Sequence, residues 1–168
     1  MSMRSREKIP ELEKVLRYSF QDKELLIQAL THPSFAFENN VPSNERLEFL
    51  GDAVLSLVAA ERLYKLFPEA SEGILTQRRA EIVQGTNLTA LSQKMGLGKY
   101  LFLGKGEKKQ GGHRTPSNLA NVLEAIIGAI YLDSGIREGR VFIHHHFLGI
   151  NPKLERRNLK TRFLKYFK

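Results

Sequence analysis

Three acidic side chains stand at helical spacing near the start of a long apolar segment, residues 44–67. Glu45, Glu48 and Asp52 occupy positions i, i+3 and i+7, so a helix projects all three along one face. Such a row is either a solvated acidic edge or a set of oxygen ligands. Carboxylates set into an apolar helix lose hydration, and this cost favours a compensating cation. Acids in the first helical turn also suit the helix dipole, which is a structural alternative to ligation for Glu45 in particular.

A second segment contributes one more carboxylate. Residues 117–134 are apolar on almost every side, which predicts a central, buried helix, and Glu124 is the one charge in its middle. Asn121 lies one turn earlier on the same side. A lone carboxylate in a buried helix is usually neutralised, ion-paired or bound to metal. Two helices that both present carboxylates are compatible with a Mg²⁺ or Mn²⁺ site, and the chain has no cysteine for a thiolate site.

Helices must position these side chains, because the apolar spacing is helical nearly throughout and no β pattern persists. We therefore expect an all-α fold. Ser43 or Asn44 is the expected N-cap of the first acidic helix. Residues 31–43 and 104–116 predict loops, the second of them mobile. The expected helices are residues 11–17, 23–30, 44–67, 72–83, 86–95, 117–134, 137–148 and 158–167.

Size and charge limit the remaining possibilities. The chain has 168 residues, 42% of them hydrophobic, which predicts one domain at residues 1–150 followed by a basic helix or linker segment at 151–168. The net charge is +8, and residues 151–168 hold seven Lys and Arg against one Glu. A second basic cluster, residues 99–114, holds five Lys and Arg against one Glu. Basic clusters are typical of polyanion binding and also of solubilising chain ends.

Three further features indicate the cytoplasm. The first ten residues carry charges without a following apolar run, so they do not resemble a signal peptide. No stretch reaches the roughly 18 uninterrupted apolar residues of a membrane span. The absence of cysteine fits a reducing compartment. We therefore expect a cytoplasmic protein with no membrane partner.

Five segments of the chain together resemble one known family. They are NERLEFLGDAVL (44–55), ALTHPSF (29–35), LGKYLFLGKGE (97–107), the glycine pair 111–112 and LANVLEAIIGAIYLDSG (119–135). In order and spacing they resemble the catalytic domain of the ribonuclease III family, enzymes that cut double-stranded RNA. The similarity runs from about residue 12 to residue 167.

This resemblance implies a metal-dependent reaction at four residues. Asp52 and Glu124 match the catalytic pair, and both also belong to the set of metal ligands, which is completed by Glu48 and Asn121. The implied cofactor is Mg²⁺, with Mn²⁺ as a substitute and no small-molecule cofactor. The implied reaction is hydrolysis of double-stranded RNA to products with 5′ phosphates and short 3′ overhangs.

Further residues receive roles through the same resemblance. Glu45 and Glu72 match acids that approach the RNA near the cleaved bond. Phe49 is most simply a core residue, but the equivalent aromatic in the family enters a pocket of the partner subunit, which implies a two-fold homodimer with signature helices at its interface. Gly51, beside it, would permit that close approach.

Two groups of polar residues are interpreted structurally. Thr31, His32 and Ser34 belong to one of the similar segments, and we expect them to form a hydrogen-bond cluster that fixes a loop. The histidines at 144–146 are consecutive, so on a helix they fan about 100° apart and cannot all bind one ion.

The chain departs from the family pattern at Asn121, where the family has an aspartate. An amide oxygen can bind a hard cation but lacks the negative charge, so weaker metal affinity or slower turnover is expected. Asn121 is either natural or an engineered inactivation. It is also the only support for an alternative function, a non-catalytic double-stranded-RNA-binding or ribosome-associated scaffold. A third hypothesis, an unrelated helical metalloprotein, lacks the Glu-x-x-His spacing expected of ferritin-like sites.

The second departure concerns length. Bacterial members of the family usually continue into a separate double-stranded-RNA-binding domain, whereas this chain stops at Lys168. NLKTRFLKYF (158–167) resembles the start of the family's linker, so we expect truncation before such a domain rather than a member with the catalytic domain alone.

Overall fold

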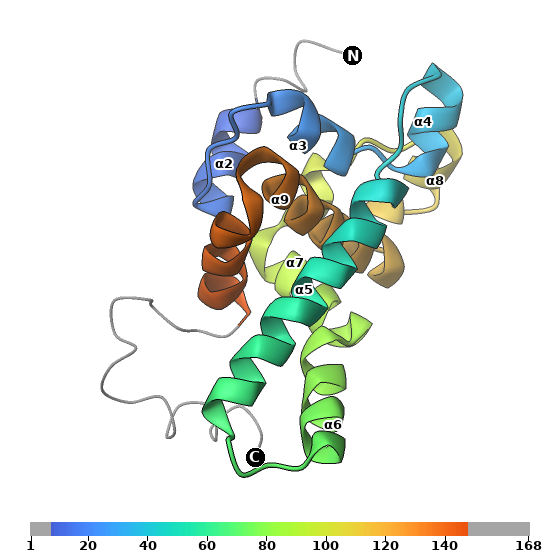
Figure 1. Ribbon diagram of the computed structural model, residues 1–168. Helices are drawn as coiled ribbons and strands as arrows, with labels where there is room; N and C mark the ends of the chain where they lie inside the picture. The colour runs from blue at the N-terminus through green and yellow to red at the C-terminus, as the bar shows by residue number, and fades with distance from the viewer. Residues whose placement is uncertain (1–7, 148–168) are drawn as a thin grey trace.

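The computed structural model describes residues 8–147, which are helical nearly throughout (Figure 1). Within that range there is no strand, only an isolated β-bridge between Thr31 and Phe102. This confirms the expected all-α fold, whereas the predicted basic segment at 151–168, with its helix at 158–167, lies outside the described residues. The elements are α2 (Ile9–Leu16), α3 (Lys23–Ala29), α4 (Pro33–Asn39), α5 (Glu45–Leu66), α6 (Glu72–Val83), α7 (Gly85–Met95), η1 (Leu97–Tyr100), α8 (Lys105–Lys109), η2 (Gly112–Arg114) and α9 (Pro116–His146).

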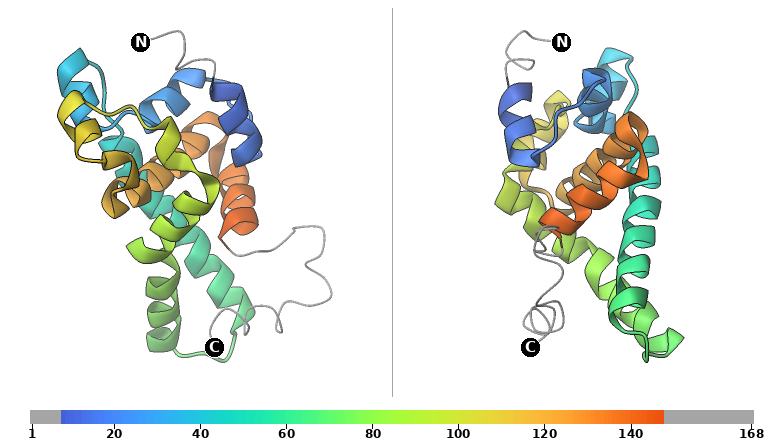
Figure 2. Two further views of the ribbon diagram at one scale, coloured as in Figure 1. Left: turned by 180° about the vertical axis from the view of Figure 1, so that it is seen from behind. Right: turned by 60° about the vertical axis from the view of Figure 1, so that its left-hand side comes forward.

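Helix α9 is the centre of the molecule, and α3, α5 and α7 pack against it (Figures 1 and 2). Its residues from Leu119 to Ile130 are almost all buried, as their apolar character predicts. By length and hydropathy alone α9 could cross a membrane, but 56% of its most apolar window is buried inside the domain, as in the core helix of a soluble protein.

Helix α5 crosses α9 at a pair of glycines. A Cβ atom at Gly51 would overlap the backbone carbonyl of Glu124, and one at Gly128 would overlap the carbonyl of Leu47. The two backbones can therefore approach this closely only because neither glycine carries a side chain. This crossing brings the first half of α5 against the middle of α9.

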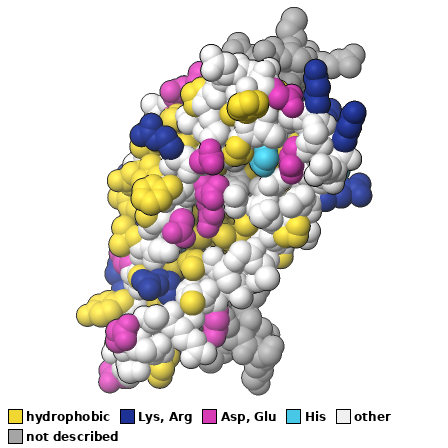
Figure 3. Space-filling view, turned by 90° about the vertical axis from the view of Figure 1, so that its right-hand side faces the viewer, with side chains coloured by type: hydrophobic (Ala, Val, Ile, Leu, Met, Phe, Trp, Pro, Cys, Tyr) yellow, Lys and Arg dark blue, Asp and Glu magenta, His cyan; other side chains and the backbone are white. Residues whose placement is uncertain are grey.

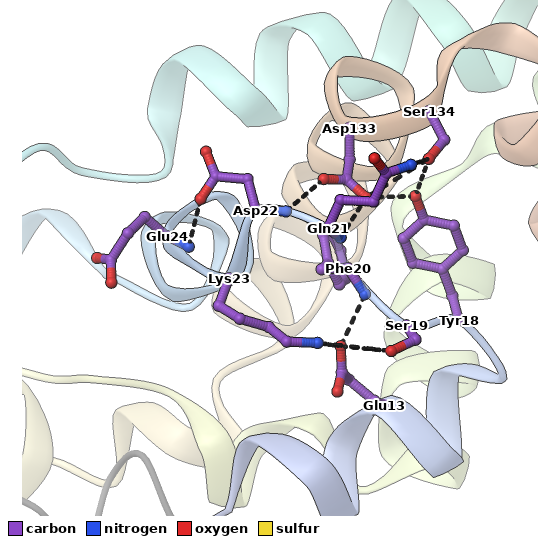
Figure 4. A network of polar contacts seen from close by, with 10 residues as sticks. All are labelled: Glu13, Tyr18, Ser19, Phe20, Gln21, Asp22, Lys23, Glu24, Asp133 and Ser134. Carbon is purple, nitrogen blue, oxygen red and sulfur yellow. Dashed lines mark hydrogen bonds and ion pairs between the residues drawn. The ribbon is translucent and has the colours of Figure 1, made fainter.

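Helix α9 changes direction at Gly135, whose φ of 78° and ψ of −177° are non-helical. This agrees with the predicted helix end at Gly135, because a positive φ favours glycine. A polar network beside the kink ties it to the turn between α2 and α3 (Figure 4). Asp133 accepts hydrogen bonds from the backbone N–H groups of Gln21 and Asp22 at 3.0 and 2.8 Å, and from the Tyr18 hydroxyl at 2.5 Å. Burial and this last bond raise the pKa of Tyr18 to about 12.

The second half of α5 and helix α6 form a projecting helical hairpin (Figure 1). A small apolar cluster of Ala59, Leu63 and Ile82 joins the two helices. The predicted bounds of α6 are confirmed, and the Ser71 side chain caps its first turn by accepting a long hydrogen bond from the Ile74 N–H at 3.5 Å.

Two local predictions are wrong. Residues 31–43 contain α4, which starts at Pro33 because proline fixes a helical φ there and His32 Nδ1 accepts the Ser34 N–H at 3.1 Å. Residues 104–116 contain α8 and η2, which are too short to show a helical period. The predicted N-cap of α5 is confirmed in position, because Asn44 is the N-cap residue. Its buried side chain donates to the Ala29 carbonyl at 3.4 Å, however, and the Ser43 hydroxyl accepts the Glu45 N–H at 3.4 Å.

Candidate functional site

The acidic side chains of α5 and α9 share one electrostatic environment. Burial, followed by the negative charges of Asp52 and Glu48 in that order, raises the pKa of Glu124 to about 7. Burial also raises the pKa of Glu48, with a smaller contribution from the charge of Glu45. The structure thus brings Glu48 and Asp52, on successive turns of α5, within electrostatic range of Glu124 across the glycine crossing.

No cation neutralises this group inside the described part of the chain. Within residues 8–147, the side chains of Glu48, Asp52, Asn121 and Glu124 take part in no hydrogen bond or ion pair with one another or with other residues. Glu48 and Glu124 are partly buried, whereas Asp52 is exposed. A partly buried carboxylate without such partners is costly, and a bound cation would remove that cost.

The four residues fit a hard divalent cation in donor chemistry and charge. Carboxylate and amide oxygens are the ligands that Mg²⁺ and Mn²⁺ prefer, and Mg²⁺ keeps several waters instead of requiring a complete protein cage. However, no group of three or more acidic or histidine side chains in residues 8–147 is gathered closely enough to hold an ion as it stands. For all four residues to bind one ion directly, their side chains must therefore rotate to bring the oxygen atoms closer together.

Asn121 lies one helical turn before Glu124 on α9 and is partly buried. Residues three apart on a helix are neighbours on its surface, so the amide belongs to the same group as Glu124. Its oxygen is not used by any hydrogen bond to the described residues and remains available as a neutral ligand. Replacement of a carboxylate by this amide lowers the negative charge of the group by one unit.

Glu45 and Glu72 lie at the margins of this arrangement. Glu45 is exposed in the first turn of α5, where it accepts a hydrogen bond from the Ser43 hydroxyl at 2.7 Å. Glu72 is exposed at the start of α6, accepts a hydrogen bond from the Thr76 hydroxyl at 2.7 Å, and is not among the charges that act on Glu124. A single chain therefore does not bring Glu72 to the α5–α9 group.

Phe49 is not a core residue, since 80% of it is exposed. Leu57 and Tyr64 continue the same surface along α5 and are 58% and 73% exposed. We call Phe49, Leu57 and Tyr64 the α5 apolar strip. The face shown in Figure 3 carries a row of acidic side chains beside a hydrophobic patch.

A buried polar network fixes the start of α9 relative to α4 and α8. His32 Nε2 donates to Asn118 Oδ1 at 3.2 Å, because its Nδ1 already accepts the N–H of Ser34. Asn118 Nδ2 in turn donates to Glu107 Oε1 at 2.8 Å and to the Gly112 carbonyl at 3.0 Å. The predicted hydrogen-bond cluster is confirmed for His32 and Ser34, whereas the Thr31 hydroxyl donates instead to the Ile27 carbonyl at 2.8 Å. The sequence analysis did not identify Asn118 or Glu107. The signal for Asn118 was a polar residue at the start of an apolar helix, and the signal for Glu107 was an acid in a basic segment.

Comparison with known sequences gives consistent matches. The family model described as Ribonuclease-III-like matches residues 22–150. Ribonuclease 3 of Pseudomonas fluorescens strain SBW25 is 53% identical over 132 residues, which cover 79% of this chain and 56% of the relative. Ribonuclease 3 of Shewanella sp. strain MR-7 is 46% identical over 162 residues, which cover 94% of this chain and 70% of the relative. The chain thus spans little more than half the length of some curated relatives.

Solved structures give the same result. The nuclease domain of ribonuclease III from Campylobacter jejuni superposes with a TM-score of 0.79 at 40% identity, covering 88% of this chain and 98% of that domain. A second structure of that domain, described as showing flexibility in a region involved in dimer formation, has a TM-score of 0.77. Dicer from Pichia stipitis matches with a TM-score of 0.57 at 30% identity, covering 84% of this chain and 59% of Dicer. On this evidence of sequence and fold, the chain belongs to the ribonuclease III family.

Proposed function

We propose that this protein is an endoribonuclease that hydrolyses double-stranded RNA with divalent-metal catalysis. The observation that carries the proposal is the half-buried Glu124, which faces the like charges of Asp52 and Glu48 without a compensating cation among the described residues. A site that concentrates negative charge in this way is suited to a divalent cation, and such a cation attracts a phosphate group.

Asp52 and Glu124 are the proposed catalytic residues, with Glu48 and Asn121 as further metal ligands. When bound, Mg²⁺ would lower the pKa of water and offset negative charge on the phosphate. Asp52 and Glu124 would hold the ion from two helices and accept hydrogen bonds from the attacking water. Because the pKa of Glu124 lies near 7 without metal, this carboxylate also exchanges its proton near neutral pH.

Basic residues outside the acidic group suit the RNA backbone. Lys105, Lys108 and Lys109 are exposed on α8, which lies beside α4 near the start of α5 (Figure 1). They contribute to the basic cluster at residues 99–114. A duplex is recognised mainly through its shape, its phosphates and its 2′-hydroxyls, so we expect little sequence preference and strong salt dependence. We place this activity in the cytoplasm.

We further propose that the active form is a homodimer joined through the α5 apolar strip. Phe49, Leu57 and Tyr64 form a row of large exposed apolar side chains along one helix, which costs free energy unless a partner covers them. In a two-fold dimer each strip packs against its copy. The partner subunit also offers a way to bring Glu72 near an α5–α9 acidic group, which one chain does not do.

The second candidate, a non-catalytic RNA-binding scaffold, is favoured by Asn121 alone. One experiment separates the two. Labelled duplex RNA is incubated with this chain in Mg²⁺ and in Mn²⁺, beside Asp52→Asn and Glu124→Gln variants as inactive controls. Cleavage by the parent chain that both variants lose supports the nuclease. Binding of the duplex without any cut strand, in either metal, contradicts the nuclease and supports the scaffold.

A further inference from the structure

Cationic and histidine side chains gather where three helices end near one another. His146, in the last turn of α9, donates from Nε2 to the carbonyl of Leu16 at 3.0 Å and so ties this turn to the end of α2. The His145 and His146 rings lie 4.7 Å apart, and the positive charges of Arg17 and Lys94 act on His146. Figures 1 and 2 show the end of α9 beside α2 and α7. We call Arg17, Lys94, His145 and His146 the α2–α9 basic cluster.

Within residues 8–147, no carboxylate forms an ion pair with this cluster, whereas several other cations have such a partner. Lys23 pairs with Glu13, and Lys65 and Arg140 both pair with Glu61. Arg17 and Lys94 are exposed and form no ion pair with any described residue. The charges that act on the two histidines are those of Arg17, Lys94 and the neighbouring ring. Burial and these positive charges lower the pKa of both histidines, so an anion bound here would relieve the repulsion.

The backbone of Arg17 gives an independent reason to look for a role. Its φ of 54° and ψ of 32° are left-handed, which is unfavourable for a residue with a long side chain and favourable for glycine. The other non-glycine residue with a positive φ among residues 8–147 is Asn40, a type that adopts this conformation readily. The cap of α2 uses only the backbone N–H of Arg17. The guanidinium therefore occupies a position where glycine would fold at least as well.

We propose that the α2–α9 basic cluster is a second phosphate-binding surface, which holds the backbone of duplex RNA away from the cleavage site. A guanidinium, an ammonium and an imidazole, carried by three neighbouring elements, are groups that bind the oxygens of a phosphate. In Figure 1 the ends of α2 and α9 lie on the left of the molecule and the start of α5 lies on the right, so the cluster is separate from the acidic side chains of the α5–α9 crossing. The chain also continues from α9 towards residues 151–168, which carry seven Lys and Arg against one Glu.

This inference rests on the proposed function in one respect, namely that the anion is RNA. The test uses the full chain in EDTA, so that RNA binds without being cut. The test variant is Arg17→Gly with Lys94→Gln, in which glycine suits the left-handed backbone and folding is expected to survive. The matched control is Lys23→Gln with Lys65→Gln, which removes the same charge from two exposed lysines that already have carboxylate partners. A charge-preserving double variant, Arg17→Lys with Lys94→Arg, tests rescue.

The measurement is the affinity for a duplex of about 30 base pairs across a series of KCl concentrations. If both side chains contact phosphates, the slope of log affinity against log salt falls by about 2 in the test variant, and its affinity at low salt falls roughly tenfold. The control is expected to keep the parent slope, and the charge-preserving variant to restore it. A test variant that behaves like the control overturns the proposal.

Calorimetry with inorganic phosphate distinguishes the source of the anion. The test variant could lose phosphate binding and still bind RNA as tightly as the control variant. That result overturns the assignment of the anion to RNA. A parent chain that binds duplex RNA through the cluster but cuts no RNA in Mg²⁺ or Mn²⁺ contradicts the proposed function and leaves this surface standing.

Discussion

Replacement of Glu124 by glutamine tests whether the negative charges at the α5–α9 crossing destabilise the fold. Glutamine has the same shape but no charge, so it removes the repulsion with Asp52 and Glu48 and the cost of burying an ion. The pKa of Glu124 is about 7 in the folded chain against an ordinary value of 4.5. A shift of about 2.5 pKa units corresponds to roughly 3 kcal/mol before solvent screening. Because the side chain is only half-buried, about 1–2 kcal/mol is the expected effect.

The sign of the pH dependence follows from linkage. A carboxyl whose folded pKa is raised contributes stability below its unfolded pKa of 4.5, and that contribution is lost as the pH rises through 7. Without metal, Glu124→Gln is therefore expected to be more stable than the parent at pH 8.5, by about 3–6 °C in Tm, and nearly equal to it at pH 4.5.

Thermal unfolding in EDTA at these two pH values measures the difference. Glu72→Gln is the matched control, because Glu72 is exposed and outside the group of charges that act on Glu124. Added Mg²⁺ is expected to raise the Tm of the parent and to have less effect on the variant. A variant that is no more stable than the parent at pH 8.5 would refute the electrostatic reasoning.

The other predictions concern the charge of the site, the helix crossing, the dimer and acid stability. Asn121→Asp is expected to increase Mg²⁺-dependent cleavage, and equal rates at saturating metal would contradict its role as a ligand. Gly51→Ala is expected to cost about 3 kcal/mol in urea unfolding, because its Cβ meets the Glu124 backbone, whereas Gly73→Ala, with open space around it, is expected to be neutral or stabilising. Phe49→Asp is expected to shift sedimentation towards the monomer, and an unchanged dimer would exclude the α5 apolar strip as the interface. Burial lowers the pKa of His146, so the unfolded chain binds more protons and stability is expected to fall as the pH drops below about 6.5, a slope that His146→Gln should reduce in pH-dependent melts.

The sequence predicts the long elements well because their signals are local. The start of α6 follows from the Ser71 cap, and the end of α7 follows from Gly96 in a left-handed conformation. Helices α4 and α8 were missed because each has seven residues or fewer and depends on contacts with other parts of the chain. Glu38, for example, accepts the Lys105 N–H at 2.8 Å and so links these two helices.

For the candidate site, the sequence supplies the residue types and not their mutual arrangement. Helical spacing shows that Glu48 and Asp52 share a face of α5, but it does not show which helix that face meets. That choice depends on Gly51 and Gly128, which lie far apart along the chain and lack side chains at the same point of contact. The position of Phe49 was also undecided, because an aromatic residue in an apolar helix fits a core as well as an interface.

The glycine crossing and the charge of the site are physically coupled. Gly51 directly precedes Asp52 and lies one turn after Glu48, so the contact that admits the Glu124 backbone also forces the three carboxylates together. The favourable free energy of helix packing at Gly51 and Gly128 must therefore exceed the electrostatic repulsion among the carboxylates that this packing brings together. It follows that Gly51→Ala, by separating the helices, should lower the pKa of Glu124 towards its ordinary value. In that background Glu124→Gln should stabilise less than it does in the parent, and the difference between the two effects measures how strongly the crossing holds the charges together.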